Sequence, residues 1–149
     1  MNALAAHLVL DGPLRVLDGG NLFDLYAIAR TVRRKTFHLQ AAMEHLRIAR
    51  AFTCYQVAAL LDKQEAVSAP LLVMDLLATF YDENVPLDER LRLLEHCLAR
   101  IQRLGRAAPL VVSATLPTHS DELLARLKQT IQHTWHFEPE SKPTQARLL

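Results

Sequence analysis

Apolar residues along the chain follow two patterns, short continuous runs and longer segments with a helical period. The runs lie at 13–18, 45–52, 70–77, 109–116 and 133–137. The third and fourth runs, PLLVMDLL and PLVVSATL, contain Val, Leu and Met with little polar alternation. Such composition is typical of parallel strands that are covered on both faces. The runs therefore predict five strands.

The segments between the runs predict helices, each with one apolar face. We expect Asn21 to be the N-cap of the first, and Thr53 to be the N-cap of a later one. The apolar face of the first would consist of Leu22, Leu25, Tyr26, Ile28, Ala29 and Val32. The longest helix would carry a stripe of Leu91, Leu94, Leu98, Ile101 and Leu104. Gly105 stands where the C′ residue of that helix should be, and Ser120 opens a last helical pattern.

Strands that alternate with helices indicate βαβ units and an α/β fold. We expect a three-layer α/β/α arrangement around a mostly parallel five-stranded sheet. Residues 1–137 would form the single domain. Residues 138–149 contain two prolines and few apolar side chains, which predicts an extended or flexible C-terminal tail.

Composition and charge narrow the class of protein. Half of the 149 residues are apolar, and 17 basic side chains nearly balance 16 acidic ones, which excludes disorder by composition. A net charge of +1 gives no whole-protein argument for nucleic acid, so such binding needs a local patch. Cys54 and Cys97 read as reduced thiols on helices, with a disulfide or metal role as the alternative. No apolar run is long enough to span a membrane, and we expect a cytoplasmic protein.

Candidate chemistry gathers where the predicted strands end, since ligands of parallel sheets bind at the carboxyl ends of the strands. The residues there are Asp18 with Gly19 and Gly20, Arg50, Asp75, and the segment 113–115. Asp18 and Asp75 could hold Mg²⁺ through water, because hard cations take oxygen ligands. Alternatively, both aspartates cap helices or accept hydrogen bonds from loop amides.

Four stretches, in this order, resemble the core of RecA/RadA-type recombinases. VLDGGNLFDLYAIAR is similar to the strand and helix after the family's Walker A segment, and RIARAFTCYQVAALLD is similar to its Ala-Arg-Ala-Phe stretch. The Walker B strand of the family resembles LLVMDLLATFYDENV. The long helix and the strand that follow it in the family resemble CLARIQRLGRAAPLVVSATLP. The resemblance covers residues 14–137.

The resemblance implies that most of the catalytic parts are missing. No Gly-Lys-Ser/Thr phosphate loop occurs. Gly20 stands in place of the glutamate that activates water, and Leu116 in place of the glutamine that senses phosphate. Asp75 alone matches, as the Walker B aspartate. Asp18, Asn21 and Asp75 would then be a vestigial nucleotide or metal site.

The implied function is that of a non-catalytic, RecA-like accessory or assembly module, linked to DNA recombination and repair. No cofactor is expected. The partner would be a second copy of the chain or a RecA-like protein. The apolar helix predicted over MNALAAHLVL would pack either on its own sheet or on a neighbour's.

Two basic segments are candidates for nucleic-acid contacts. Arg30, Arg33, Arg34 and Lys35 lie within about one helical turn, next to Phe37 and His38. The second set is Arg90, Arg92, Arg100, Arg103 and Arg106. Clustered cations near an aromatic ring bind phosphates and stack a base. Ordinary solvated helix faces have the same composition.

A nuclease is the alternative function. VLDGGN also resembles the first strand of PIN/NYN-type nucleases. That resemblance implies that Asp18, Asn21, Asp75 and either Asp82 or Glu83 hold one or two Mg²⁺ ions for phosphodiester hydrolysis. The acidic residues after the fourth strand arrive late, on a helix, which departs from that family's pattern.

Overall fold

Helices and strands alternate through the computed structural model, which describes residues 1–115 and 122–137. The first half contains α1 (Asn2–Asp11), β1 (Leu14–Asp18), α2 (Leu25–Arg33), α3 (Leu39–Glu44), β2 (Leu46–Arg50) and α4 (Cys54–Asp62). The second half contains β3 (Leu71–Met74), the 3₁₀ helix η1 (Ala78–Tyr81), α5 (Leu87–Gly105), β4 (Leu110–Val112) and α6 (Glu122–Thr130). The short α3 and η1 were not predicted.

The sheet has four parallel strands in the order β2-β1-β3-β4. The α/β class and the parallel sheet are confirmed, whereas the prediction of five strands is wrong. Residues 133–137 form no strand, and Trp135 and Phe137 are 71% and 89% exposed. A strand needs a neighbour for its backbone hydrogen bonds, and no described strand pairs with this segment.

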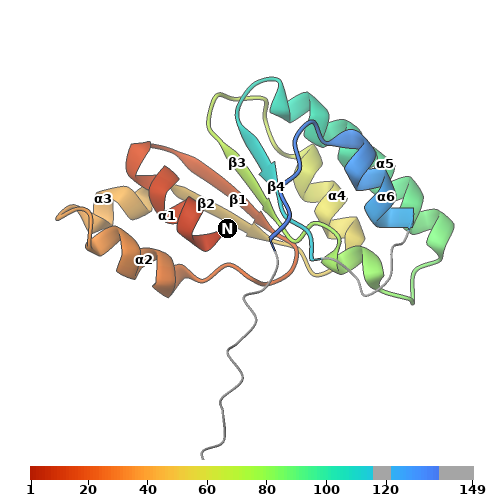
Figure 1. The fold of residues 1–149 in the computed structure, drawn as a ribbon, viewed down its shortest axis with the longest axis horizontal. Coiled ribbons are helices and arrows are strands. Elements are labelled where there is room, and N and C mark those ends of the chain that lie inside the picture. Colours follow the sequence, from red (N-terminus) through yellow and green to blue (C-terminus); the bar gives the residue numbers. More distant parts are fainter. Residues whose placement is uncertain (116–121, 138–149) are drawn as a thin grey trace, which may run out of the picture.

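Helices cover both faces of the sheet, as Figure 1 shows, with α1, α2 and α3 on one side and α4, α5 and α6 on the other. The two faces carry separate hydrophobic clusters. Val16 and Met74 face the first layer, and Leu17 and Val73 face the second. This alternation along β1 and β3 follows from the period of two residues in a strand. The arrangement is the expected three-layer one.

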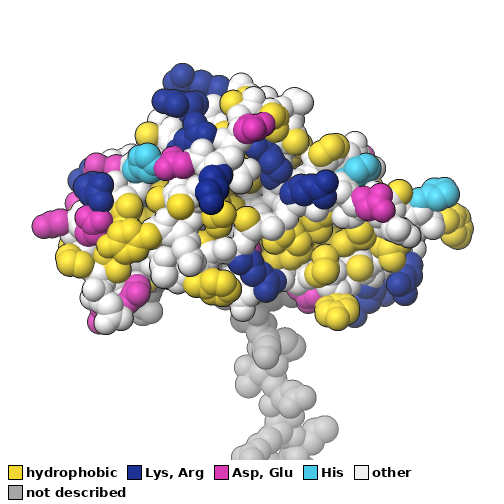
Figure 2. All heavy atoms as spheres, turned by 180° about the vertical axis from the view of Figure 1, so that it is seen from behind, with side chains coloured by type: hydrophobic (Ala, Val, Ile, Leu, Met, Phe, Trp, Pro, Cys, Tyr) yellow, Lys and Arg dark blue, Asp and Glu magenta, His cyan; other side chains and the backbone are white. Residues whose placement is uncertain are grey.

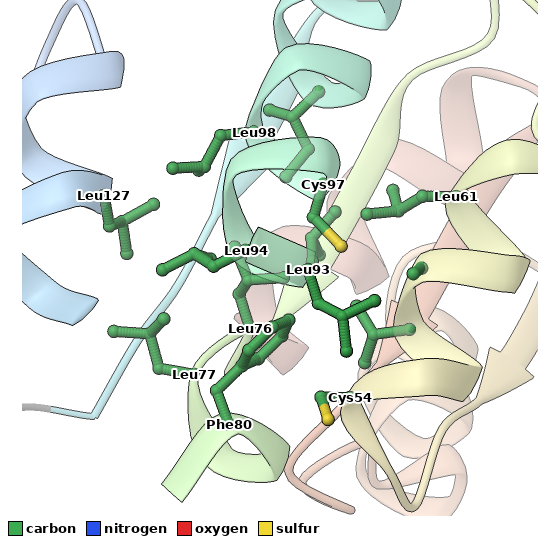
Figure 3. Close-up of a cluster of buried hydrophobic side chains, with 14 of the residues drawn as sticks. Cys54, Leu61, Leu76, Leu77, Phe80, Leu93, Leu94, Cys97, Leu98 and Leu127 are labelled. Carbon is green, nitrogen blue, oxygen red and sulfur yellow. The ribbon is translucent and has the colours of Figure 1, made fainter. Parts of the chain in front are cut away.

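The second cluster joins α4, α5, η1 and α6. Figure 3 shows Cys97 of α5 beside Leu61 of α4, with Phe80 of η1 below Leu94. The predicted apolar stripe of α5 is confirmed, with Leu91 partly buried and the other members fully packed in this cluster. Both cysteines are free and buried, as expected.

The amino-terminal helix α1 packs on its own sheet. Ala5, Ala6 and Val9 have no exposed surface and belong to the first cluster. Of the two predicted alternatives for this segment, the structure therefore supports the intramolecular one.

Helix α2 begins later than predicted. Asp24, rather than Asn21, is the N-cap, and its carboxylate accepts a hydrogen bond from the Ala27 amide at 2.9 Å. Asn21 has a φ of 55° and lies in the preceding turn. Among the predicted apolar face, Ile28 and Val32 are buried, whereas Leu22, Leu25 and Tyr26 are exposed. Leu22 precedes the helix, and Leu25 and Tyr26 lie on its exposed first turn.

Thr53 caps α4 as predicted, because its hydroxyl accepts a hydrogen bond from the Gln56 amide at 3.2 Å. Gly105 is the last residue of α5 and not a residue beyond its end. The cap is Arg106, which has a right-handed φ of −77°. The predicted helix start at Ser120 lies outside the described residues. Among the described residues, no helix has both the length and the apolar character needed to cross a membrane.

Candidate functional site

Asp18 and Asp75 lie at the point where the strand order reverses. From β1 the chain moves outward to β2, returns to β3 on the other side of β1, and continues to β4. Open α/β sheets bind ligands in the crevice at such a switch point. Asp18 is the last residue of β1 and is paired with Met74, so Asp75 follows on the neighbouring strand. The structure therefore brings both predicted aspartates to one edge of the sheet.

The Asp18 carboxylate closes the turn that follows β1. It has no exposed surface, and its two oxygens accept hydrogen bonds from the amides of Leu22 and Phe23, at 3.0 and 3.1 Å. Nε of Arg50, at the end of β2, lies 3.3 Å from Oδ2. The same guanidinium donates to the Phe23 carbonyl at 3.0 Å. These partners balance the buried charge and fix the chain from Gly19 to Phe23.

Asp75 joins the end of β3 to the end of β4. Its backbone has a φ of 48°, in the left-handed region. The Asp75 amide donates to the Ser113 hydroxyl at 3.0 Å. Its two carboxylate oxygens accept hydrogen bonds from the amide and the hydroxyl of Thr115, at 2.8 and 2.9 Å. Asp75 therefore forms hydrogen bonds with groups of the loop after β4, which agrees with the interpretation that it accepts hydrogen bonds from loop amides.

Gly20 packs directly against Asp75. A Cβ atom at position 20 would lie 2.6 Å from the Asp75 Cβ and 2.8 Å from its Oδ2. Such distances are far below van der Waals contact, so a side chain here would displace Asp75 or the turn. The close approach gives a structural reason for glycine at the position where the recombinase resemblance expects a glutamate.

A shallow crevice of about 410 Å³ opens beside these aspartates. Its lining includes Gly20, Asn21, Phe52, Tyr81 and Asp82. Phe52 is 70% exposed. Sequence reasoning missed Phe52 and Tyr81 as lining residues, although Phe52 ends the run at 45–52 and Tyr81 follows the run at 70–77 by four residues.

The described residues do not assemble a metal cluster. They contain no group of three or more His, Cys, Asp or Glu side chains that could hold an ion. Asp82 accepts hydrogen bonds from the amide and side chain of Asn84, at 3.0 and 2.8 Å, within its own turn. The Asp18 oxygens are already occupied by two amides and Arg50. The donor set therefore fits Mg²⁺ poorly.

The two basic segments differ in their surroundings. On α5, Arg92 pairs with Glu89 at 2.7 Å, and Arg100 donates to three backbone carbonyls at the end of α4. On α2 and after it, Arg30, Arg33, Arg34 and Lys35 are exposed, and their side chains form no hydrogen bond or ion pair with any other described residue. Figure 2 shows Lys and Arg side chains in separate groups, with hydrophobic side chains between them.

No family model matches the chain, and no curated protein matches it either.

Proposed function

We propose that this chain is a non-catalytic, RecA-like interaction module that acts by assembling, foremost with a second copy of itself. The observation that supports this most directly is the state of the strand-end carboxylates. Asp18 and Asp75 hold the loops around the crevice together, through amides, Arg50 and Thr115. Residues engaged in this way stabilise the fold and are not poised to hold a metal ion for a reacting phosphate.

The chain also lacks the other groups that nucleotide hydrolysis needs. A triphosphate needs a loop of backbone amides and a lysine to neutralise its charge. The sequence has no such loop, and Gly20 provides no base. RecA-like domains without a phosphate loop fit a role in which the sheet is kept for its surface.

The two edges of the sheet point to where that surface lies. Exposed edge strands are templates for pairing with another chain, and charged side chains are a common protection. The β2 edge carries Arg47 and Arg50. The β4 edge consists of Leu110, Val111 and Val112, without a charge, and no described strand pairs with its outer side. The β4 edge is therefore the unprotected one.

Hydrogen bonds within the sheet identify the groups on the outer side of β4. The Pro109 carbonyl accepts from the Leu71 amide at 3.0 Å, and the Ser113 amide donates to the Val73 carbonyl at 2.9 Å. Residues in a ladder alternate between its two sides. Pro109, Val111 and Ser113 therefore face β3, whereas the amide of Val112 points away from it. A second β4 strand would pair with this amide.

Val112→Pro tests the assembly. Proline removes the outward N–H and leaves the bonds to β3 in place. Light scattering at micromolar and higher concentrations should report a mass above one chain for the wild type and one chain for Val112→Pro. Val112→Ala is the matched control, since it loses the same side-chain packing but keeps the N–H, and it should remain assembled. Wild-type protein that is monomeric throughout, with no loss of solubility, would overturn self-assembly.

The non-catalytic part of the proposal has its own test. Calorimetry with ATP and Mg²⁺ should show no binding at micromolar concentrations. Mn²⁺ should leave the melting temperature unchanged, because a cation that binds the folded state would raise it. Metal-dependent cleavage of RNA or DNA by the pure wild type, abolished in Asp18→Asn, would replace this proposal with the nuclease.

A further inference from the structure

One face of α2 presents exposed aromatic and cationic side chains in a row. Tyr26, Arg30 and Arg33 are spaced by four and three residues, so they lie on the same side of the helix. Phe37 follows four residues later, just past the helix end. The opposite side of α2 carries Ile28 and Val32, which are 1% and 0% exposed in the core. Packing of that side on the sheet directs the row outward.

The cations of this row have no acidic partner. Residues 25–43 contain no Asp or Glu, whereas Arg30, Arg33, Arg34 and Lys35 all lie within them. None of these four side chains forms an ion pair or hydrogen bond with another described residue. Because the whole chain has a net charge of only +1, positive charge is concentrated here beyond the average of the surface. These cationic side chains are therefore available to an anionic partner, because no contact with the described residues would have to be broken.

The aromatic rings at both ends of the row are almost fully in water. Tyr26 is 89% exposed and Phe37 is 104% exposed. Large aromatic side chains gain from burial, and neither ring contributes to the core. Tyr26 and Arg33 are about 10 Å apart along the helix axis, from a rise of 1.5 Å per residue. A short flexible polyanion spans such a length.

We propose that the α2 row of Tyr26, Arg30, Arg33 and Phe37, together with the adjacent Arg34 and Lys35, binds single-stranded nucleic acid. Phosphates would contact the cations, and unpaired bases would stack on the two rings, which is how sequence-tolerant single-strand sites combine charge and stacking. Bases of a duplex are already stacked on each other, so their faces are not available to stack on the two rings. A bilayer would need the apolar side of the helix, and that side is buried in the protein.

The test compares two pairs of arginines near the C-terminal ends of helices. Arg33 and Arg34 are in the last turn and the C-cap of α2, and Arg103 and Arg106 are in the last turn and the C-cap of α5. Binding of fluorescent oligothymidylate and oligouridylate is measured by anisotropy over a salt series. Arg33→Gln/Arg34→Gln should weaken binding and reduce the slope of log K against log salt by about 1.4, from about 0.7 per phosphate contact. Arg103→Gln/Arg106→Gln changes the net charge by the same amount, and it should leave the affinity and the salt slope unchanged.

Stacking is tested separately from charge. Phe37→Ala should weaken oligothymidylate binding about tenfold without changing the salt slope, whereas Phe37→Trp should retain binding. A duplex of the same length, polyglutamate and phosphatidylserine vesicles serve as competitors. Equal losses in the two arginine pairs, unchanged binding in Phe37→Ala, stronger competition by duplex, polyglutamate or vesicles, or no binding at low salt would overturn the proposal.

This inference goes beyond the proposed assembly and does not require it. The α2 row lies on a helix of the first layer, and the β4 edge is on another element. Val112→Pro should therefore bind the oligonucleotides through the same residues when it is monomeric. Loss of assembly with binding retained would support both proposals, and loss of binding in a folded Val112→Pro protein would contradict the independence of the two surfaces.

Discussion

Close contact between Gly20 and Asp75 shapes the crevice at the level of single residues. The loop after β1 approaches the end of β3 so closely that the backbone itself forms the wall. Gly19 shares this approach, because a Cβ there would lie 3.0 Å from the Asp75 carbonyl oxygen. The two glycines therefore let the Asp18 and Asp75 turns pack against each other.

Gly20→Ala should destabilise the protein, because the added methyl group would overlap Asp75 at 2.6 Å. Overpacking of this kind costs about 1–3 kcal/mol, measured as the free energy of unfolding in urea. Gly105→Ala is the control. Its Cβ would meet Leu110 at an ordinary 3.9 Å, and alanine in a helix gains up to about 1 kcal/mol over glycine. The prediction fails if the two variants shift stability in the same direction.

Sequence reasoning located the strand-end residues but could not decide their role. The positions of Asp18 and Asp75 after apolar runs, together with the alternation of helices and strands, placed them on one edge of the sheet. Their hydrogen bonds depend on the turn after β1 and on Thr115, which lies 40 residues from Asp75. A pattern in the sequence carries no information on which amides a carboxylate accepts from.

At the level of elements, Asp18 holds the turn that precedes α2. Its carboxylate accepts hydrogen bonds from the amides of Leu22 and Phe23 and holds them in the turn, and the helix begins only after Asp24, its N-cap. Asp24→Ala should therefore cost about 1 kcal/mol of unfolding free energy, a typical loss for an N-cap. Asn21→Gly should not destabilise, because Asn21 is exposed and has a φ of 55°, which glycine adopts freely. A larger loss in Asn21→Gly would restore Asn21 as the cap.

Helices and strands with a long regular pattern could be predicted from the sequence, whereas short segments whose structure depends on their neighbours could not. The α5 stripe spans several turns, and the apolar runs of β3 and β4 are continuous, so their patterns were unambiguous. The run at 133–137 has strand-forming residues, yet strand propensity depends on neighbours that the sequence does not show. Gly105 was misplaced because glycine ends many helices but also occurs within them.

At the level of the whole molecule, the cysteine of α5 links stability to pH. Burial, then the nearby charges of Asp62 and Cys54, raise the pKa of the Cys97 thiol to about 12 from an ordinary 9.0. Burial also raises the pKa of Cys54. An unfolded chain loses these thiol protons near pH 9, whereas the folded chain keeps them. The stabilisation is therefore fully present below pH 9 and is lost as pH rises toward about 12.

Cys97→Ala isolates this effect. The other ionisable side chains are the same in both proteins, so the difference between wild type and variant reports the thiol. Unfolding free energies measured in urea between pH 7 and pH 11, a range that spans the ordinary thiol pKa of 9.0, should fall more steeply for the wild type. Parallel curves for the two proteins would show that the buried thiol does not contribute.

The contrast between the two sheet edges has a consequence for the size of the assembly. A sheet that could grow at both edges would add copies without limit and form fibres. Arg47 and Arg50 place charge on β2, and no described strand covers the outer side of β4, so the proposed pairing of β4 with its own copy would use the same strand on both sides. Such a contact is related by a two-fold axis and closes on itself. If the chain assembles as proposed, we therefore expect a dimer.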